Sequence, residues 1–217
     1  AGGKYADAVA SYLKIKKDPV LKAAAQCYIP VCLEANGQAS QAIALELKAV
    51  KDETSLYTGE SLLNLAIHIY RNSHSKSDYK KAAAFAIRSA KWAESGGGNM
   101  LEVDMTPLAA AMKEFPVPEN MIAKDTFGRI YRPGLPTEAI FNRASCRWYL
   151  LDLILKAKLL SAFLMSQAGD SRSAIEELKA ADEINRTNGG HLLSDFWNFD
   201  RISGDIKTGS FRIESGL

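Results

Sequence analysis

Residue types that perform covalent or acid–base catalysis occur in this sequence without the partners that would activate them. Cys146 has no acidic residue or histidine beside it, and the sequence contains no Gly-x-Ser-x-Gly or His-Glu-x-x-His pattern. Asp182 and Glu183 are adjacent on a predicted helix, where neighbouring side chains diverge, so they cannot work as a paired acid and base. We therefore predict no catalytic residues and a protein that is not an enzyme.

The sequence also lacks the motifs that hold phosphates or metal ions. Three glycines at 96–98 follow no predicted strand and precede no lysine at the spacing of a phosphate-binding loop. Cys27, Cys32 and Cys146 are odd in number and form no Cys-x-x-Cys pair, which disfavours a disulfide framework and a zinc site. His68 is a lone histidine on an amphipathic helix, a pattern typical of a hydrogen-bonded structural residue. We predict no cofactor and no metal.

Composition and charge narrow the choice of partner and compartment. The 217 residues include 27 basic and 25 acidic side chains, and the net charge of +2 gives no electrostatic reason to expect nucleic acid. The most apolar stretch, 148–165, contains Asp152, Lys156 and Lys158, which would be costly inside a bilayer, so we predict no membrane span. The first ten residues lack the apolar core of a secretory signal, and the unpaired cysteines favour a reducing intracellular compartment.

Apolar residues recur at helical spacing through 1–95. The pattern predicts one amphipathic helix around 4–15 and then two complete helical hairpins. The first hairpin turns at Gly37, and the second turns across a polar linker, after which Asp78 is the expected N-cap. The four helices of these hairpins are predicted at 21–35, 40–50, 61–72 and 78–94.

The helical period fails across 96–136, where prolines are frequent, and we predict an irregular Pro/Gly-rich insertion there. Within it, four residues have the composition of interface anchors, because aromatic and arginine side chains carry much of the binding energy at protein interfaces. These candidate partner-binding residues are Phe127, Arg129, Tyr131 and Arg132. The alternative is a loop that folds back over the helix that follows.

Helical spacing resumes across 137–204. The first helix of this part is apolar around most of its circumference, so we expect the insertion, or a second protein, to cover it at Trp148, Tyr149 and Leu150. The predicted elements are a long helix at 137–167, a hairpin helix at 171–186, a capping helix at 192–202 and a C-terminal tail at 205–217.

The spacing of small residues resembles that of the tetratricopeptide repeat (TPR) family, in which a small residue opens the turn and two alanines lie on the second helix of each hairpin. Alanine at a helix crossing lets two backbones approach closely. Gly3 and Gly37 are 34 residues apart, which is the period of this family. The matching sets are Gly3 with Ala8, Gly37 with Ala42 and Ala49, Gly169 with Ala174 and Ala181, and Ser77 with Ala82 and Ser89.

The resemblance, which covers about two-thirds of the chain, implies an all-α fold. The expected architecture is an α-α superhelix, a solenoid of about three and a half TPR-like hairpins interrupted by the insertion. The chain departs from the family pattern at Pro30, where the family prefers glycine, and in its first unit, which lacks its first helix. The alternative is an irregular helical bundle whose alanine spacing arises by chance.

In this family the first helices of the hairpins line a concave face that binds the partner. The residues that the resemblance implies for this role, on exposed faces, are Tyr28, Val31, Glu34, Asn64, His68 and Arg71. Only Asn64 and Arg71 resemble the set with which some family members clamp the terminal carboxylate of a peptide. The alternatives are that Asn64 and Arg71 are merely solvated and that Tyr28 serves packing.

The resemblance implies a non-catalytic protein–protein interaction scaffold, an adaptor or a structural subunit of a larger complex that binds another protein or a peptide. The alternative is a peptide-binding sensor or regulator of the TPR type. A third reading is an RNA-binding helical repeat, although acidic residues offset lysines such as Lys80 and Lys81. A homo-oligomer through the apolar side chains of Tyr5, Val9 and Tyr12 is a further hypothesis.

Overall fold

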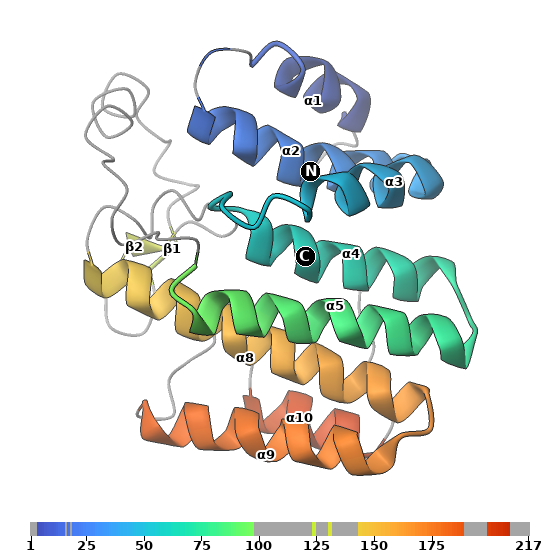
Figure 1. Cartoon of the computed structure of the whole chain (residues 1–217), viewed down its shortest axis with the longest axis vertical. Helices are drawn as coiled ribbons and strands as arrows, with labels where there is room; N and C mark the ends of the chain where they lie inside the picture. Colours follow the sequence, from blue (N-terminus) through green and yellow to red (C-terminus); the bar gives the residue numbers. More distant parts are fainter. Residues whose placement is uncertain are drawn as a thin grey trace.

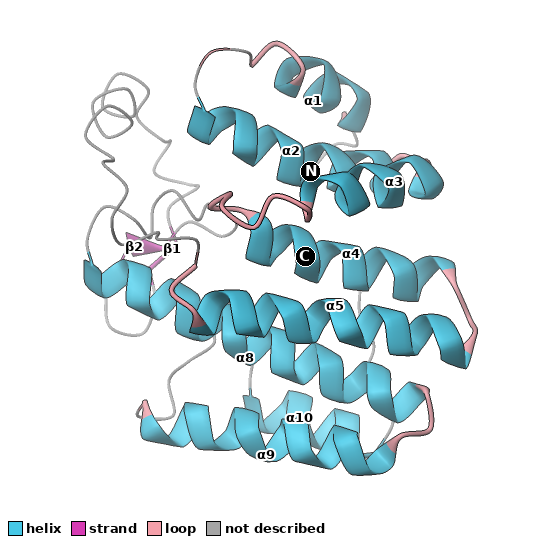
Figure 2. Ribbon diagram, in the orientation of Figure 1, coloured by secondary structure: helices cyan, strands magenta, loops and turns pink. Residues whose placement is uncertain are grey.

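The computed structural model describes residues 4–15, 17, 19–97, 123–124, 130–131, 143–188 and 199–208. Apart from turns and one pair of two-residue strands these residues are helical, which confirms the all-α class (Figure 2). The helices are α1 (Tyr5–Tyr12), α2 (Pro19–Ala35), α3 (Ala39–Ala49), α4 (Thr58–Asn72), α5 (Lys76–Glu94), α8 (Arg143–Gln167), α9 (Ser171–Thr187) and α10 (Phe199–Thr208). The strands β1 (Ala123–Lys124) and β2 (Ile130–Tyr131) are antiparallel.

From α1 to α9 the helices are stacked in chain order along the long axis of the molecule (Figure 1). Each helix packs on its neighbours in this order, and α5 packs directly on α8 although a long segment of chain separates them. The pairs α2–α3, α4–α5 and α8–α9 correspond to the predicted hairpins. α10 departs from the order, since it packs back on α8.

Contacts between hairpins show that α2, α4 and α8 run in the same direction. Tyr28, in the middle of α2, contacts the start of α4, and side chains near the end of α2 or α4 contact the end of the next helix. These contacts are Tyr28–Glu60 and Glu34–Arg71 between α2 and α4, and Tyr70–Phe163 between α4 and α8. We call α2, α4 and α8 the first helices, because each begins a hairpin.

Glycines end α2, α5 and α8 in the same way. Gly37, Gly96 and Gly169 have φ angles of +79°, +97° and +84°, in the left-handed region that glycine adopts without a steric cost. After Gly37 and Gly169 the next N–H donates to the carbonyl five positions back, at 2.8 Å and 2.9 Å. These bonds satisfy carbonyls at the helix ends, and the glycines thereby fix where the chain leaves each helix.

The start of α5 differs from the prediction that Asp78 is its N-cap. The helix begins at Lys76, and Ser75 is the N-cap, because its hydroxyl accepts a hydrogen bond from the Asp78 N–H at 3.1 Å. The Asp78 carboxylate accepts hydrogen bonds from the hydroxyls of Ser73 and Ser75 at 2.5 Å and 2.6 Å. The Ser75 hydroxyl therefore both accepts from the Asp78 N–H and donates to the Asp78 carboxylate, and these bonds close the first turn of α5.

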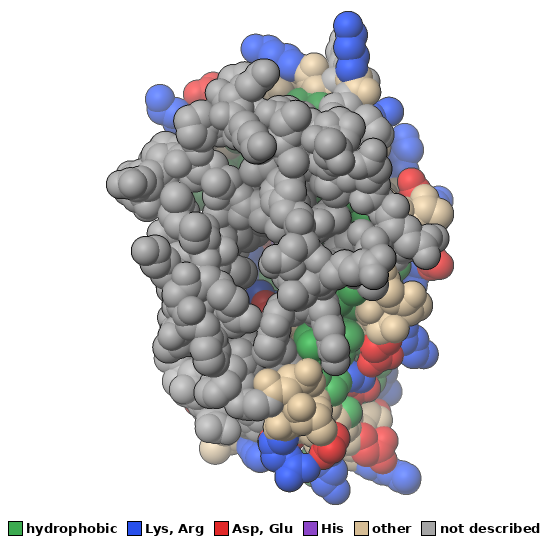
Figure 3. All heavy atoms as spheres, turned by 90° about the vertical axis from the view of Figure 1, so that its left-hand side faces the viewer, with side chains coloured by type: hydrophobic (Ala, Val, Ile, Leu, Met, Phe, Trp, Pro, Cys, Tyr) green, Lys and Arg blue, Asp and Glu red, His purple; other side chains and the backbone are tan. Residues whose placement is uncertain are grey.

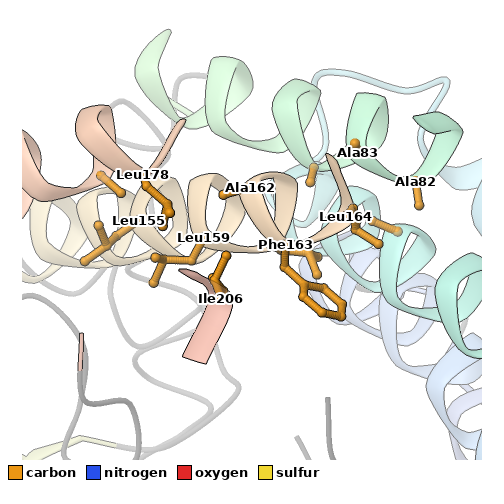
Figure 4. Packing of buried hydrophobic residues seen from close by; sticks show 13 residues of the cluster. Ala82, Ala83, Leu155, Leu159, Ala162, Phe163, Leu164, Leu178 and Ile206 are labelled. Atoms are coloured by element: carbon orange, nitrogen blue, oxygen red, sulfur yellow. The ribbon is translucent and has the colours of Figure 1, made fainter. Parts of the chain in front are cut away.

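α8 lies at the centre of the larger core cluster (Figure 4). Its Leu155, Leu159 and Phe163 are at most 1% exposed, and alanines of α4 and α5 let these helices approach closely. Ile206 of α10, 3% exposed, packs on the same cluster. α4, α5, α9 and α10 all contact α8, so helices of this chain cover it on more than one side.

The second core cluster joins α2, α5 and α8 around Trp92. Tyr149 and Leu150 pack in this cluster, so helices of this chain cover them, whereas the side chain of Trp148 lies outside the described residues. Gly59, at the start of α4, lies against Trp92 and Leu153 of this cluster. A Cβ atom there would lie 2.5 Å from Trp92 and 2.6 Å from Leu153, so the close approach of α4, α5 and α8 requires glycine.

The predicted capping helix at 192–202 is displaced in the structure. α10 spans Phe199–Thr208, so its second half lies in the segment predicted to be a tail, and 192–198 lie outside the described residues. Gly204 lies within the helix, and the burial of Ile206 against α8 compensates for its low helix propensity.

Candidate partner-binding site

Three of the residue pairs that join α2 to α4 include residues predicted for partner binding. The Tyr28 hydroxyl donates to Glu60 Oε2 at 3.1 Å, and Arg71 Nη1 donates to Glu34 Oε2 at 3.4 Å. Asn64 Nδ2 lies 3.7 Å from the sulfur of Cys27. We call these three pairs, Tyr28–Glu60, Cys27–Asn64 and Glu34–Arg71, the α2–α4 seam. Val31, the other predicted residue of α2, is partly buried on the same stripe of the helix.

The prediction that His68 lies on an exposed face is wrong. His68 is 2% exposed, and its Nδ1 lies 2.9 Å from Oε2 of Glu46, a fully buried residue of α3. Glu46 lies on the same buried face of α3 as Ala42, and this face packs towards α4. Glu46 is therefore a buried partner for His68. Burial raises the pKa of Glu46 more than the hydrogen bond with His68 lowers it. His68 therefore has the structural, hydrogen-bonded role that its isolation in the sequence indicates.

Glu60 lies where the three first helices meet. Its Oε2 accepts the hydrogen bond from Tyr28 of α2, and on α8 an ion pair joins Asp152 to Lys156 at 2.8 Å, one helical turn apart. Gly59, next to Glu60 in the chain, lies against Leu153 of α8, which brings the start of α4 beside this helix. We call Tyr28, Glu60, Asp152 and Lys156 the junction site.

The environment of Glu60 brings its protonation equilibrium close to neutrality. Burial raises the pKa of its carboxyl to about 7, while Lys156 and the hydrogen bond from Tyr28 act to lower the pKa and Asp152 acts to raise it. Glu60 therefore exchanges protons near neutral pH. A charge that arrives at the junction site would shift this equilibrium, so ligand binding and proton binding at Glu60 are coupled.

Tyrosines surround one side of the junction site. Tyr28 stacks on Tyr12 of α1 with ring centroids 6.4 Å apart, and it meets Tyr57 edge-on at 6.0 Å. The hydroxyl of Tyr149 on α8 is buried and has no hydrogen-bond partner among the described residues. Burial, and then the Glu60 charge, raises the pKa of Tyr28 and of Tyr149, so both phenols stay neutral.

Most of the insertion residues predicted as interface anchors lie outside the described residues, namely Phe127, Arg129 and Arg132. Tyr131 belongs to β2, where it pairs with Ala123 of β1. The prediction of an irregular insertion missed these two strands, because two-residue strands are too short to leave a periodic pattern in the sequence.

The sequence prediction also missed Glu46, Glu60, Asp152 and Lys156. Glu60 precedes Asn64 by four residues and Arg71 by eleven, a spacing that places all three on one face of α4. That spacing could have identified Glu60. The contribution of α8 could not be found in this way, because Asp152 and Lys156 reach the junction site only through the packing of the third hairpin on the second.

A separate hollow of about 360 Å³ lies between the start of α4 and the end of α5. Arg88 lines this hollow. Its guanidinium is already paired, since it donates to the Glu53 carboxylate at 3.0 Å and to the Val50 carbonyl at 3.4 Å. In the parts of the chain that the structure describes, no three His, Cys, Asp or Glu side chains gather in a group that could hold a metal ion.

Three further findings concern the surface charge, membrane spans and similarity to known proteins. On the described part of the face shown in Figure 3, Lys and Arg side chains are interspersed with Asp and Glu side chains. Among the helices given above, none combines the length and the apolar character needed to cross a membrane. Comparisons with known protein families, with curated proteins and with solved structures found no match.

Proposed function

We propose that this protein is a non-catalytic interaction module, an adaptor or structural subunit built as a TPR-like solenoid, which binds a segment of another protein along its first helices. The shared direction of α2, α4 and α8 supports this architecture, because hairpins related by a translation place their first helices side by side and parallel. Tyr28, Val31 and Asn64 of these helices keep part of their surface open to a partner.

The observation that carries the proposal is the contact of α10 with α8. α10 comes from outside the three hairpins, and its Ile206 is buried in the cluster that contains Leu159 and Phe163. A first helix of this protein thus packs against a short helix that presents an apolar side chain. Recognition of amphipathic helices by apolar grooves works in the same way between proteins. We expect α2 and α4 to receive a partner segment as α8 receives α10.

The test is a selection of random displayed peptides, about twelve residues long, on the purified full chain. We expect peptides that bind saturably in fluorescence anisotropy. Val31→Arg on α2 should weaken their binding about tenfold or more, because a long charged side chain would occupy the face. The matched control is Leu45→Arg on α3, at a residue that is 39% exposed, and it should leave the affinity unchanged. No binding peptide, or equal losses in both variants, would contradict the proposal.

The mass of the isolated chain, measured by light scattering, separates the two forms of this function. A peptide-binding adaptor or regulator is expected to be a stable monomer, because its binding face is needed only when the partner is present. A structural subunit is expected to form a defined oligomer or to require a second protein, because it keeps apolar surface for a permanent interface.

A further inference from the structure

We propose that the hollow between the start of α4 and the end of α5 binds a small organic acid, whose carboxylate takes the place of Glu53 on the guanidinium of Arg88. Leu62, which lines the hollow, lies two residues from Glu60 and from Asn64, and two residues correspond to about 200° around a helix. The hollow and the α2–α4 seam are therefore on opposite sides of α4. This inference goes beyond the proposed function and does not depend on it.

The hollow has the size and the lining of a site for a small molecule. Its volume of about 360 Å³ falls within the range of about 300–1,000 Å³ that is typical of such sites. Buried side chains form its inner part, and exposed charged side chains form its rim. The buried ones are Thr58, Leu62 and Trp92, and the charged ones are Glu53, Arg88 and Lys91. This lining suits a ligand with an apolar body and one charged group.

The charges at the rim favour an anion. Arg88 and Lys91 are three residues apart on α5, so they lie on the same face of the helix. Their two positive charges stand against the single negative charge of Glu53, so the described side chains that line the hollow sum to a charge of +1. Lys91 forms no ion pair with any side chain that the structure describes. Its ammonium group is therefore available to a ligand.

Glu53 shows which chemical group Arg88 is arranged to bind. Arg88 Nη2 donates to Glu53 Oε1 at 3.0 Å, and the two side chains are 43% and 70% exposed. An ion pair as exposed as this one adds little stability, so the carboxylate of a ligand can replace that of Glu53. The main chain of Glu53 stays in place, because its carbonyl accepts a hydrogen bond from Trp92 Nε1 at 3.0 Å. Only the side chain of Glu53 has to turn away.

Two further contacts hold the guanidinium in position while its carboxylate partner is exchanged. Arg88 also donates to the Val50 carbonyl at 3.4 Å, and its guanidinium carbon lies 5.9 Å from the centroid of the Phe85 ring. Because neither contact involves Glu53, the guanidinium is already oriented when the ligand arrives, which lowers the entropic cost of binding.

The test is a nuclear magnetic resonance titration of the full chain with phenylacetate and with its uncharged amide, phenylacetamide. The reporters are the backbone amides of 58–62 and 88–95 and the indole N–H of Trp92, because these groups surround the hollow. We expect phenylacetate to shift their signals saturably, with a Kd in the millimolar range because the probe is small. Phenylacetamide should bind about tenfold or more weakly, because it lacks the charge.

Two variants break the same ion pair but should change the affinity in opposite directions. Arg88→Gln removes the cation and should weaken the binding of phenylacetate about tenfold or more. Glu53→Gln removes the competing carboxylate and should strengthen the binding about two- to fivefold. If the pair had only a structural role, both affinities would change in the same direction. The matched control is Lys81→Gln, which removes a positive charge near the other end of α5 and should leave the affinity unchanged.

Several outcomes would overturn the carboxylate site. These are the absence of any shift with phenylacetate, equal binding of the two probes, an affinity that Arg88→Gln leaves unchanged, and a Glu53→Gln variant that binds no more tightly than the wild type. None of these results bears on the peptides selected on the first helices, so the proposed function is judged separately.

Discussion

The two interfaces between successive first helices are held by different kinds of contact. Between α2 and α4, the α2–α4 seam consists of polar pairs, two of which involve a carboxylate. Between α4 and α8, Tyr70 meets Phe163 edge-on at 5.0 Å beside a cluster of buried alanines and leucines. One side of α4 therefore carries polar contacts, and the other side belongs to the apolar core.

This difference indicates which part of the first-helix face can exchange its contacts for a ligand. A partly exposed ion pair contributes about 0–1 kcal/mol, so water or a ligand group can replace it at little cost. Opening the apolar interface would instead expose core surface, at about 25 cal/mol for each Å². We therefore expect ligand groups to replace contacts at the α2–α4 seam, while the apolar contact between Tyr70 and Phe163 near the ends of α4 and α8 stays fixed.

The largest effect is expected from removing a side chain of the apolar interface. Phe163→Ala should lower the free energy of unfolding by about 4 kcal/mol, because Phe163 is 1% exposed and its loss leaves a cavity beside Tyr70. Urea denaturation monitored by circular dichroism measures this change. Leu47→Ala on α3, at a residue that is 42% exposed, is the control and should cost less than about 1 kcal/mol. Equal losses in the two variants would contradict the importance of this interface.

Removal of a buried polar partner should have the next largest effect. His68→Ala should cost about 3 kcal/mol, because it leaves Glu46 buried without the partner that lies 2.9 Å away. The double variant Glu46→Leu, His68→Leu should recover most of this loss, since apolar side chains of similar size need no partner. If the double variant is as unstable as His68→Ala, the loss of stability comes from altered packing around these two positions and not from the unpaired carboxyl of Glu46.

Much of the helical framework could be predicted because its signals are local. Glycine with a left-handed backbone follows α2 and α8, and an amphipathic period fills the helices between the turns. The errors came where packing outweighs a local signal. The last helix extends past its predicted end at Ile202 to Thr208, because Ile206 is buried, and Ser75 caps α5 three residues before the predicted cap at Asp78.

The candidate site could be predicted only in part, because helical spacing shows which residues share a face but not what that face meets. The positions on α2 and α4 were predicted as exposed groove residues. Tyr28 and Asn64 instead contact residues 32 and 37 positions away, and His68 contacts Glu46, 22 positions away. Pairings over such distances depend on how one hairpin packs on the next.

Protonation of Glu60 gives a smaller effect that depends on pH. Its pKa is about 7 in the folded protein and near 4.5 in an unfolded chain, so the folded state binds this proton more tightly. The resulting stabilisation is complete below about pH 4.5 and disappears as the pH rises through 7. Glu60→Gln stays neutral, so its stability advantage over the wild type should grow from near zero below about pH 4.5 to about 2 kcal/mol at about pH 8. The full pKa difference would give about 3 kcal/mol, but Glu60 is partly exposed to solvent, which reduces the effect. Denaturation curves at a series of pH values measure this difference, and a constant difference would contradict the raised pKa.

The smallest effect is expected at the outer end of the α2–α4 seam. Glu34→Gln removes the charge opposite Arg71, but the side chains of Arg71 and Glu34 are 21% and 15% exposed and their atoms are 3.4 Å apart, so the pair is neither deeply buried nor short. We expect a loss below about 1 kcal/mol that shrinks further in high salt. Urea denaturation at low and high salt measures it. A loss approaching that of Phe163→Ala would mean that the α2–α4 seam is itself fixed, and ligand groups could then no longer replace its contacts at little cost.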